Sequence, residues 1–182
     1  MAKVYLFLAT GFEEIEALTV VDILRRDQIE VIMISVENEV YVTGAHQIVV
    51  KADLSYDEAD FEDVDMLILP GGPGHTILSE HVGLTEKIKA YNLSRKRIAA
   101  ICAAPSILGK LGVLIGKKAV CYPGYEKDLQ GAHVLKEEVV TDGNITTSRG
   151  VGTAIPFALE LIKLLDCETE SGAMKSRIIY RQ

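Results

Sequence analysis

One cysteine stands at a position suited to a reactive thiol. The apolar run Arg97–Ile101 predicts a buried strand that ends directly before Cys102, and Pro105 begins a predicted helix. A thiol at such a sharp turn meets the free N–H groups and the partial positive charge of a helix N-terminus, which favour thiolate and lower the pKa. We therefore interpret Cys102 as a nucleophile, with a small buried thiol as the alternative. For Cys121 and Cys167 a purely structural role is the favoured interpretation.

Three glutamates follow the first predicted strand, at the start of a predicted helix. Glu13 and Glu14 fit the ordinary preference of acidic side chains for a helix N-terminus. Glu16 lies one turn along, on the face that carries Val20, so we expect its carboxyl to point inward. Desolvation there raises the pKa and keeps the carboxyl protonated. A protonated carboxyl can donate a hydrogen bond to a nearby thiolate and shuttle a proton.

A glycine-rich turn follows another predicted strand. In Pro70-Gly71-Gly72-Pro73-Gly74 the glycines let backbone N–H groups converge on a small oxygen, as in an oxyanion hole. A simple tight turn is the alternative. Of the histidines, the sequence places only His75 near these residues, although a surface loop is the favoured interpretation. No metal site is expected, because neither a His-x-x-x-His spacing nor a cysteine cluster occurs.

Short apolar runs alternate with helical periodicity along the chain and must position these side chains. This alternation predicts an α/β fold: a three-layer sandwich of flavodoxin-like type, with a mainly parallel sheet and helices on both faces. The sequence around Asp142-Gly143 predicts a hairpin, and 39–50 a ribbon at an edge. Ligand sites in such sheets lie beyond the carboxyl ends of the strands, which brings three loops together. These loops are Thr10–Glu16, Pro70–His75 and Cys102–Pro105. The predicted strands are Val4–Ala9, Val31–Val36, Met66–Leu69, Arg97–Ile101 and Lys118–Cys121. Four helices are predicted: the first ends near Asp27, the second covers about Leu84–Leu93, the third begins at Pro105, and the last covers about Ala154–Leu165.

Composition limits the function classes. The chain has 182 residues, which fits a single domain over 1–182, and its net charge is −7. Nucleic acid and anionic membrane surfaces are therefore not expected partners, because both require a basic face. An odd number of cysteines, three, indicates a reducing compartment. The apolar run before Gly11 is too short for a signal peptide, and we expect a cytoplasmic protein.

Taken together, four segments resemble the ThiJ/PfpI superfamily, in the branch of the parkinsonism-associated protein DJ-one. They occur in the family's order and spacing, from residue 1 to about residue 165. The set is highly specific, although no single segment is. The segments are Leu6–Glu16, Leu69–Gly72, Ala99–Pro105 and Thr147–Thr153.

The resemblance implies a role for each site residue. Cys102 is the reactive cysteine, Glu16 is the protonated carboxyl bonded to it, and the N–H groups of Gly72 and Ala103 bind an oxyanion. It also implies a homodimer that brings the first helix and the loop after residue 147 near the partner's site, and activity that needs no added cofactor. Further pocket residues implied in this way are Gly71, Tyr122, Arg26, Ser148 and Arg149.

Two departures from the family pattern narrow the function. The protease-like branch has histidine directly after the cysteine, where this chain has Ala103. A peptidase is therefore disfavoured, as is a glutamine amidotransferase, which needs a distant His/Glu pair. The parkinsonism protein has histidine before the proline that matches Pro123, where this chain has Tyr122. A histidine base is thus lost, and Tyr122 is left to line the pocket and to bond a carbonyl oxygen.

Two function classes remain open at this point. The first is a glyoxalase or deglycase type of enzyme, a hydro-lyase or hydrolase, in which the Cys102 thiolate attacks a small 2-oxoaldehyde or an adduct of one. The second is a non-enzymatic sensor of oxidative stress, in which Cys102 is oxidised to sulfinate. A holdase chaperone is a weaker third reading. For Glu168–Gln182 both a short helix and a loose tail remain open.

Overall fold

A seven-stranded sheet forms the centre of the molecule. The computed structural model describes residues 2–181. Neighbouring strands of the sheet run parallel, except for the antiparallel pair β10–β11 at one edge. In spatial order the strands are β10 (Val139–Asp142), β11 (Ile145–Ser148), β7 (Arg97–Ile101), β6 (Met66–Leu69), β1 (Lys3–Leu8), β2 (Glu30–Ser35) and β5 (Leu54–Ser55).

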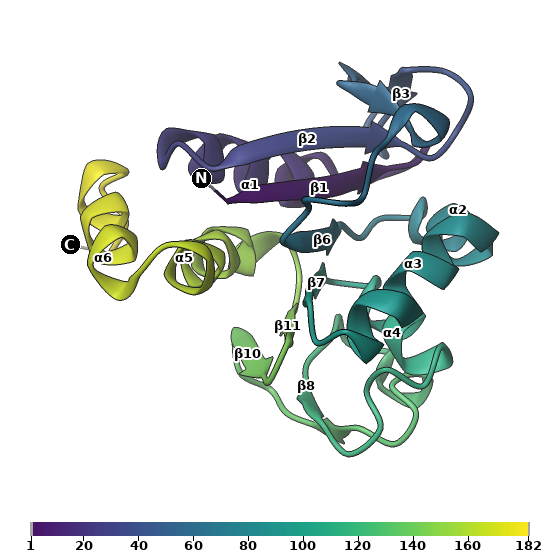
Figure 1. The fold of residues 1–182 in the computed structure, drawn as a ribbon. Coiled ribbons are helices and arrows are strands. Elements are labelled where there is room, and N and C mark those ends of the chain that lie inside the picture. Colours follow the sequence, from purple (N-terminus) through teal and green to yellow (C-terminus); the bar gives the residue numbers. More distant parts are fainter. Residues whose placement is uncertain (1, 182) are drawn as a thin grey trace.

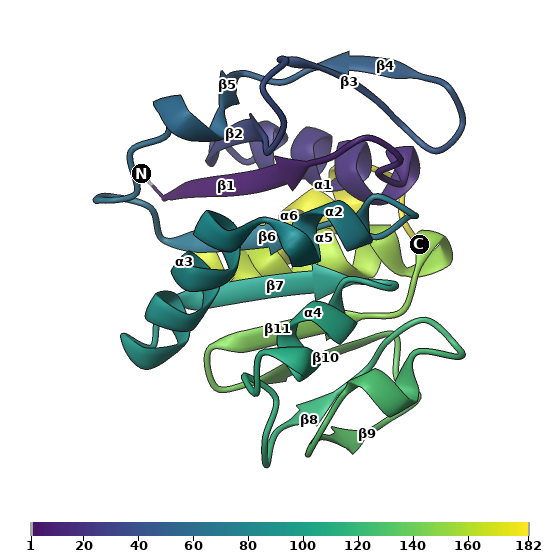
Figure 2. The same ribbon diagram turned by 90° about the vertical axis from the view of Figure 1, so that its right-hand side faces the viewer.

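Helices cover both faces of this sheet, so the predicted three-layer α/β sandwich is confirmed (Figures 1 and 2). Side chains alternate between the two faces along a strand. Val4, Leu6 and Leu8 of β1 join one core, while Tyr5 and Phe7 join the other. The first core packs against α1 (Glu14–Arg26), α5 (Ala154–Leu165) and α6 (Glu168–Arg177), and the second against α2 (His75–Glu80), α3 (Val82–Leu93) and α4 (Pro105–Lys110).

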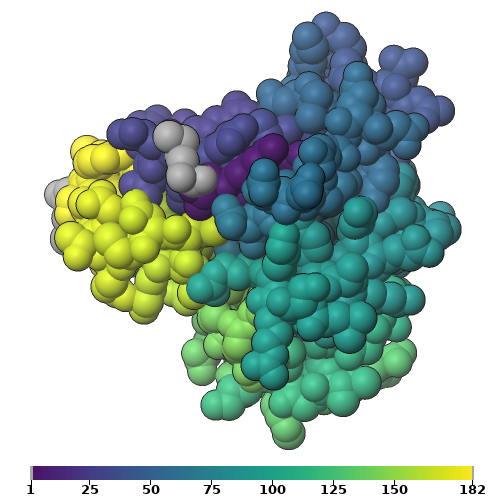
Figure 3. All heavy atoms as spheres, viewed as in Figure 1, coloured from purple at the N-terminus to yellow at the C-terminus, as the bar shows by residue number. Residues whose placement is uncertain are grey.

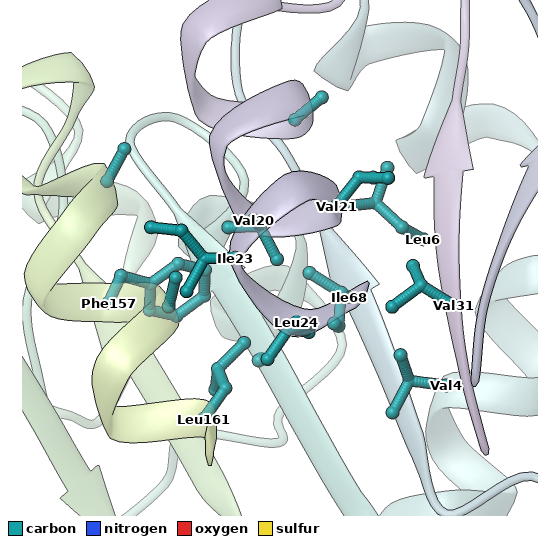
Figure 4. Close-up of a cluster of buried hydrophobic side chains, with 14 of the residues drawn as sticks. Val4, Leu6, Val20, Val21, Ile23, Leu24, Val31, Ile68, Phe157 and Leu161 are labelled. Carbon is teal, nitrogen blue, oxygen red and sulfur yellow. The ribbon is translucent and has the colours of Figure 1, made fainter. Parts of the chain in front are cut away.

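The first core explains why α1 is held firmly on the sheet. Val20, Ile23 and Leu24 of α1 lie between β1 and Phe157 of α5 (Figure 4). Their spacing along the chain is that of one helix face. Burial of such a face stabilises the fold by about 1.5–3 kcal/mol for each large apolar side chain. The helix that carries Glu16 is thereby fixed relative to the strands.

Two small ribbons lie beside the main sheet. The ribbon predicted within 39–50 is confirmed as the antiparallel pair β3 (Tyr41–Thr43) and β4 (Val49–Lys51). The hairpin at Asp142-Gly143 is confirmed between β10 and β11, and Gly143 has φ +63°. The strand expected over Lys118–Cys121 is shorter than predicted: β8 covers Lys118–Ala119 and pairs with β9 (His133–Val134). Short 3-10 helices are present at Tyr56–Glu58, Glu126–Asp128 and Val151–Thr153.

The C-terminal segment, left open by the sequence, contains helix α6. Met174 of this helix is fully buried in the first core. Arg177 donates a hydrogen bond of 2.7 Å to the carbonyl oxygen of Arg26 at the end of α1. Figure 3 shows the C-terminal residues packed against the early part of the chain. Within the part of the chain that the structure describes, every helix is too short or too polar to cross a bilayer.

Candidate active site at Cys102

Three loops meet at the carboxyl ends of β1, β6 and β7, as the fold prediction required. The N–H of Glu13 donates to the carbonyl oxygen of Gly71 at 3.0 Å, and the N–H of Gly74 donates to that of Gly11 at 3.0 Å. Gly72 has φ +84°, and a Cβ there would lie 2.5 Å from the oxygen of Gly11. Glycine is therefore needed at this turn for two independent reasons, the left-handed backbone and the close approach of the other loop.

Cys102 occupies the turn itself in a strained backbone conformation. Its φ is +65°, a region that residues other than glycine rarely adopt. Hydrogen bonds hold the turn on both sides: the Cys102 N–H donates to the Ser148 oxygen at 3.0 Å, and the Tyr122 N–H donates to the Cys102 oxygen at 2.8 Å. The helix that follows, α4, has only six residues and begins with Pro105. The predicted sharp passage from strand to helix is thus present.

Glu16 reaches the same place from α1, and its side chain is fully buried. Its Oε2 accepts a hydrogen bond of 2.9 Å from the N–H of Gly71. A Cβ on Gly71 would lie 2.6 Å from both Glu16 Oε2 and Cys102 Cβ. The missing side chain of Gly71 therefore leaves the space in which the carboxyl and the thiol meet. Glu16 Oε1 is buried and has no hydrogen-bond partner among the described residues.

Burial dominates the ionisation of this pair. Desolvation raises the pKa of Glu16 to about 7, although hydrogen bonds with Cys102 and Gly71 act to lower it. Desolvation, followed by the charge of Glu16, likewise raises the pKa of Cys102, to about 12. Hydrogen bonds from the N–H groups of Ala103 and Gly72 act on the sulfur in the opposite direction. The pair therefore loses one proton near neutral pH and retains the other.

These values correct two sequence predictions. A lowered pKa was expected for Cys102, but the short helix α4 contributes too little to offset burial and the neighbouring carboxylate. Glu16 was expected to stay protonated, yet a pKa of about 7 leaves it partly ionised at neutral pH. The expectation that burial raises the pKa of Glu16 is confirmed in direction.

A cavity of about 470 Å³ opens in front of the sulfur. Of the residues that the sequence suggested for the pocket, Tyr122 and Arg149 line it, together with Gly72, Cys102 and Glu16. The sequence did not single out the remaining lining residues, although most of them belong to segments that carried the resemblance. They are Glu13, Pro123, Gly150, Val151, Gly152 and Thr153.

Three residues predicted for the pocket, namely Gly71, Ser148 and Arg26, are not among its lining residues. Gly71 lies next to it, where its missing side chain leaves room for Glu16 and Cys102. Ser148 is fully buried behind the cavity, where its hydroxyl donates to the Glu138 oxygen at 2.8 Å. Arg26 lies at the far end of α1 and forms an ion pair of 2.7 Å with Asp22. The structure thus corrects the placement of Ser148, which supports Cys102 through its backbone, whereas Arg26 lines a different hollow of its own chain. A contribution of Arg26 to a partner's site stays a prediction.

The histidines do not supply a base for Cys102. His75 is buried, contrary to the surface position favoured from the sequence, and its Nδ1 lies 2.8 Å from the Gly72 oxygen. It therefore supports the glycine turn rather than the cavity. His46, Glu13 and Glu14 place ligand atoms within 4.8 Å of one another, an arrangement that could hold a metal ion. Only the tertiary structure brings them together, and Glu14 already binds His46 Nδ1 at 2.8 Å.

Comparisons with known proteins agree with this geometry. Residues 2–164 match the model of the family described as DJ-1/PfpI. Protein DJ-1 homolog B of Arabidopsis thaliana is 38% identical over 166 residues, which cover 90% of this chain and 38% of that protein. A deglycase of Pyrococcus horikoshii is 37% identical over 171 residues, which cover 90% of this chain and 99% of the deglycase. The solved structure of oxidized Toxoplasma gondii DJ-1 has a TM-score of 0.95, with 34% identity and coverage of 100% of both chains. The chain thus spans well under half the length of the Arabidopsis relative.

Proposed function

Because this chain belongs to the DJ-1/PfpI family, we propose that it acts on small 2-oxoaldehydes or on their adducts, with Cys102 as nucleophile and without an added cofactor. The observation that carries the proposal is the buried carboxyl of Glu16 meeting the strained cysteine at the floor of an open cavity. The Pyrococcus relative is named a deglycase, which supports adducts as a second kind of substrate. We also propose a cytoplasmic location and a homodimer.

The proposed first step adds the thiol to the aldehyde carbon. Glu16, with a pKa of about 7, accepts the proton of Cys102 as the carbon–sulfur bond forms. The carbonyl π bond opens, and the resulting oxyanion is held by the N–H groups of Gly72 and Ala103. Glu16 then returns the proton to this oxygen, which gives a neutral hemithioacetal. Atoms and charge balance without any outside reductant or oxidant.

The second step turns the hemithioacetal into a 2-hydroxy acid. Hydrogen moves from the former aldehyde carbon to the neighbouring carbonyl carbon, and the hydroxyl proton moves to the oxygen of that neighbouring carbon, which leaves a 2-hydroxy thioester on Cys102. Water then cleaves the thioester, releases the acid and restores the thiol. With methylglyoxal the sum is one water added and one lactate released. Tyr122 lines the cavity, and we propose that its hydroxyl bonds the second carbonyl oxygen during this transfer.

The test is to incubate the protein with methylglyoxal and to follow the mixture by proton NMR. Lactate should appear, and its rate of formation should rise with pH through about 7, because ionised Glu16 is the base. Glyoxal should give glycolate in the same way. Absence of both acids with folded protein would overturn the enzymatic proposal.

A sensor function is the second candidate, supported by the partial exposure of the sulfur. Cys102 is half-buried and open to the cavity, whereas Cys121 is buried and does not line it. We expect mild peroxide to add oxygen to Cys102 first, to the level of sulfinate. Peptide mass spectrometry measures the order of oxidation. Earlier oxidation of Cys121 or the exposed Cys167 would rule out a sensor based on Cys102.

A further inference from the structure

One cation lines the cavity in front of Cys102, and its guanidinium forms no ion pair with another side chain of residues 2–181. Arg149 directly follows β11 and is the only positively charged residue among those that line the cavity. Its backbone N–H donates a hydrogen bond to the hydroxyl oxygen of Thr153. Within residues 2–181 its side chain forms neither a hydrogen bond nor an ion pair. The guanidinium of Arg149 is thus available to bind a ligand that enters the cavity.

The backbone under Arg149 is held rigidly. The hydroxyl oxygen of Thr153 accepts from the N–H groups of Arg149 at 3.2 Å and of Gly150 at 3.0 Å. The same oxygen lies 2.7 Å from the hydroxyl of Ser148, which is itself fully buried. Because the Thr153 hydroxyl contacts three successive residues, Ser148, Arg149 and Gly150, the backbone position of Arg149 is fixed. Such fixation reduces the entropy lost when a ligand is bound.

The acidic groups nearest to Arg149 are engaged elsewhere. Glu16 is turned to Gly71 and Cys102, and Glu13 Oε1 lies 3.7 Å from His46 Nδ1. Glu126, which feels the charge of Arg149, accepts a hydrogen bond of 2.7 Å from the N–H of Gly124. Glu126 is thus close enough to interact with the charge of Arg149, but no carboxylate within residues 2–181 forms an ion pair or a hydrogen bond with the guanidinium. A planar guanidinium matches the two oxygens of a carboxylate or a phosphate.

We propose that Arg149 determines substrate specificity by binding an anionic group, so that the site prefers aldehydes bearing a carboxylate or a phosphate over neutral aldehydes of similar size. Arg149 can act in this way only if Cys102 is the nucleophile proposed above. During the addition of sulfur to the carbonyl carbon the anionic group stays unchanged on Arg149. The thiol proton moves through Glu16 to the former carbonyl oxygen.

A matched pair of alkylating agents tests this without requiring turnover. Iodoacetate and iodoacetamide are nearly the same size, and only iodoacetate is an anion. At each cysteine we take the ratio of the iodoacetate rate to the iodoacetamide rate. The ratio at Cys102, divided by the ratio at the exposed Cys167, should be about 10. Peptide mass spectrometry reads both cysteines in one sample. Cys167 therefore serves as the internal reference for intrinsic reactivity.

Variants of Arg149 decide the result. Arg149→Gln should lower the normalised ratio to about 1, and Arg149→Lys should leave an intermediate value, because lysine keeps the charge but loses the fork. Lys136→Gln is the matched control, since Lys136 also acts on Glu126 but does not line the cavity. An unchanged ratio in Arg149→Gln, or an equal loss in Lys136→Gln, would overturn the proposal. Failure of methylglyoxal to protect Cys102 against iodoacetamide would instead count against Cys102 as the nucleophile.

Protection by aldehydes then distinguishes the two anions. Glyoxylate is compared with glycolaldehyde, and glyceraldehyde 3-phosphate with glyceraldehyde, as reversible protectants of Cys102 against iodoacetamide. We expect at least one anionic member to protect at about tenfold lower concentration than its neutral partner, and Arg149→Gln to remove the difference. The member that protects identifies carboxylate or phosphate as the group bound. Equal protection within both pairs would overturn the proposal.

Discussion

Replacing Cys102 with alanine is expected to lower the rate of lactate formation from methylglyoxal by at least about a thousandfold, to the level of the uncatalysed reaction. Alanine cannot form the hemithioacetal, so neither the proton transfer by Glu16 nor the oxyanion contacts have an intermediate on which to act. The fold should persist, because alanine fits a space in which cysteine packs beside Gly71. Loss of lactate measured by NMR, with an unchanged circular dichroism spectrum, is the expected result.

Two control variants separate the nucleophile from a general need for thiols. Cys167→Ala removes an exposed cysteine after α5 and should leave the rate unchanged. Cys102→Ser keeps the shape of the turn but replaces the thiol by a hydroxyl that Glu16 cannot deprotonate efficiently, so it should be nearly as slow as the alanine variant. Equal rates in wild type and Cys102→Ala would show that the reaction does not pass through this sulfur.

Replacing Glu16 with glutamine is expected to change how stability depends on pH. The folded-state pKa of Glu16 is about 7, against an ordinary value of 4.5, because burial disfavours the charged form. A group with a raised folded pKa stabilises the fold fully below its unfolded pKa and loses this contribution as pH rises through the folded pKa. Ionisation of Glu16 should therefore cost about 3 kcal/mol between pH 4.5 and pH 8. Glutamine cannot ionise and avoids this loss.

The measurement is the free energy of unfolding in urea at pH 4.5 and pH 8, in wild type and in Glu16→Gln. Wild type should lose about 3 kcal/mol more than the variant over this interval. His46 and Glu14 also carry shifted pKa values, but they are present in both proteins and cancel in the comparison. Glu86→Gln, at an exposed position on α3, should behave as wild type.

The sign of the change in stability with pH, compared between wild type and Glu16→Gln, shows which group of the pair ionises. If wild type gained stability relative to Glu16→Gln as pH rises, Cys102 would be the group that ionises, with Glu16 retaining the shared proton. In that case the thiolate would exist before substrate arrives, and Glu16 would act first as a hydrogen-bond donor. The raised pKa of Cys102 argues for the opposite sign.

The architecture was predictable because its signals are local and repeated. Apolar runs such as Met66–Leu69, followed by turn residues, mark strands buried on both faces, and the spacing of Val20, Val21 and Leu24 marks the face of a helix. Parallel order then follows from the crossovers, and the carboxyl ends of β1, β6 and β7 must share one edge. Hence the loops that carry Glu16, Gly72 and Cys102 could be brought together from sequence.

The electrostatics of the site could not be predicted in the same way. The pKa of Cys102 depends on a balance between N–H groups that favour thiolate and burial that opposes it, and sequence indicates only the first. Similarly, the short β8 and the buried His75 depend on contacts with distant segments. Long-range packing overrides local propensity at such positions.

By itself, the sequence determined the parallel sheet, the loops that meet at its carboxyl edge and the residue types that carry chemistry there. Only the tertiary structure decided that the Cys102 thiol is desolvated, that Ser148 supports the turn through its backbone, and that Arg149 lines the cavity without an ion pair to any of residues 2–181. The physical reason is the separation in sequence over which each interaction acts. Periodicity and turn chemistry act between residues close in sequence, whereas burial and charge pairing depend on which distant atoms share a few ångströms of space.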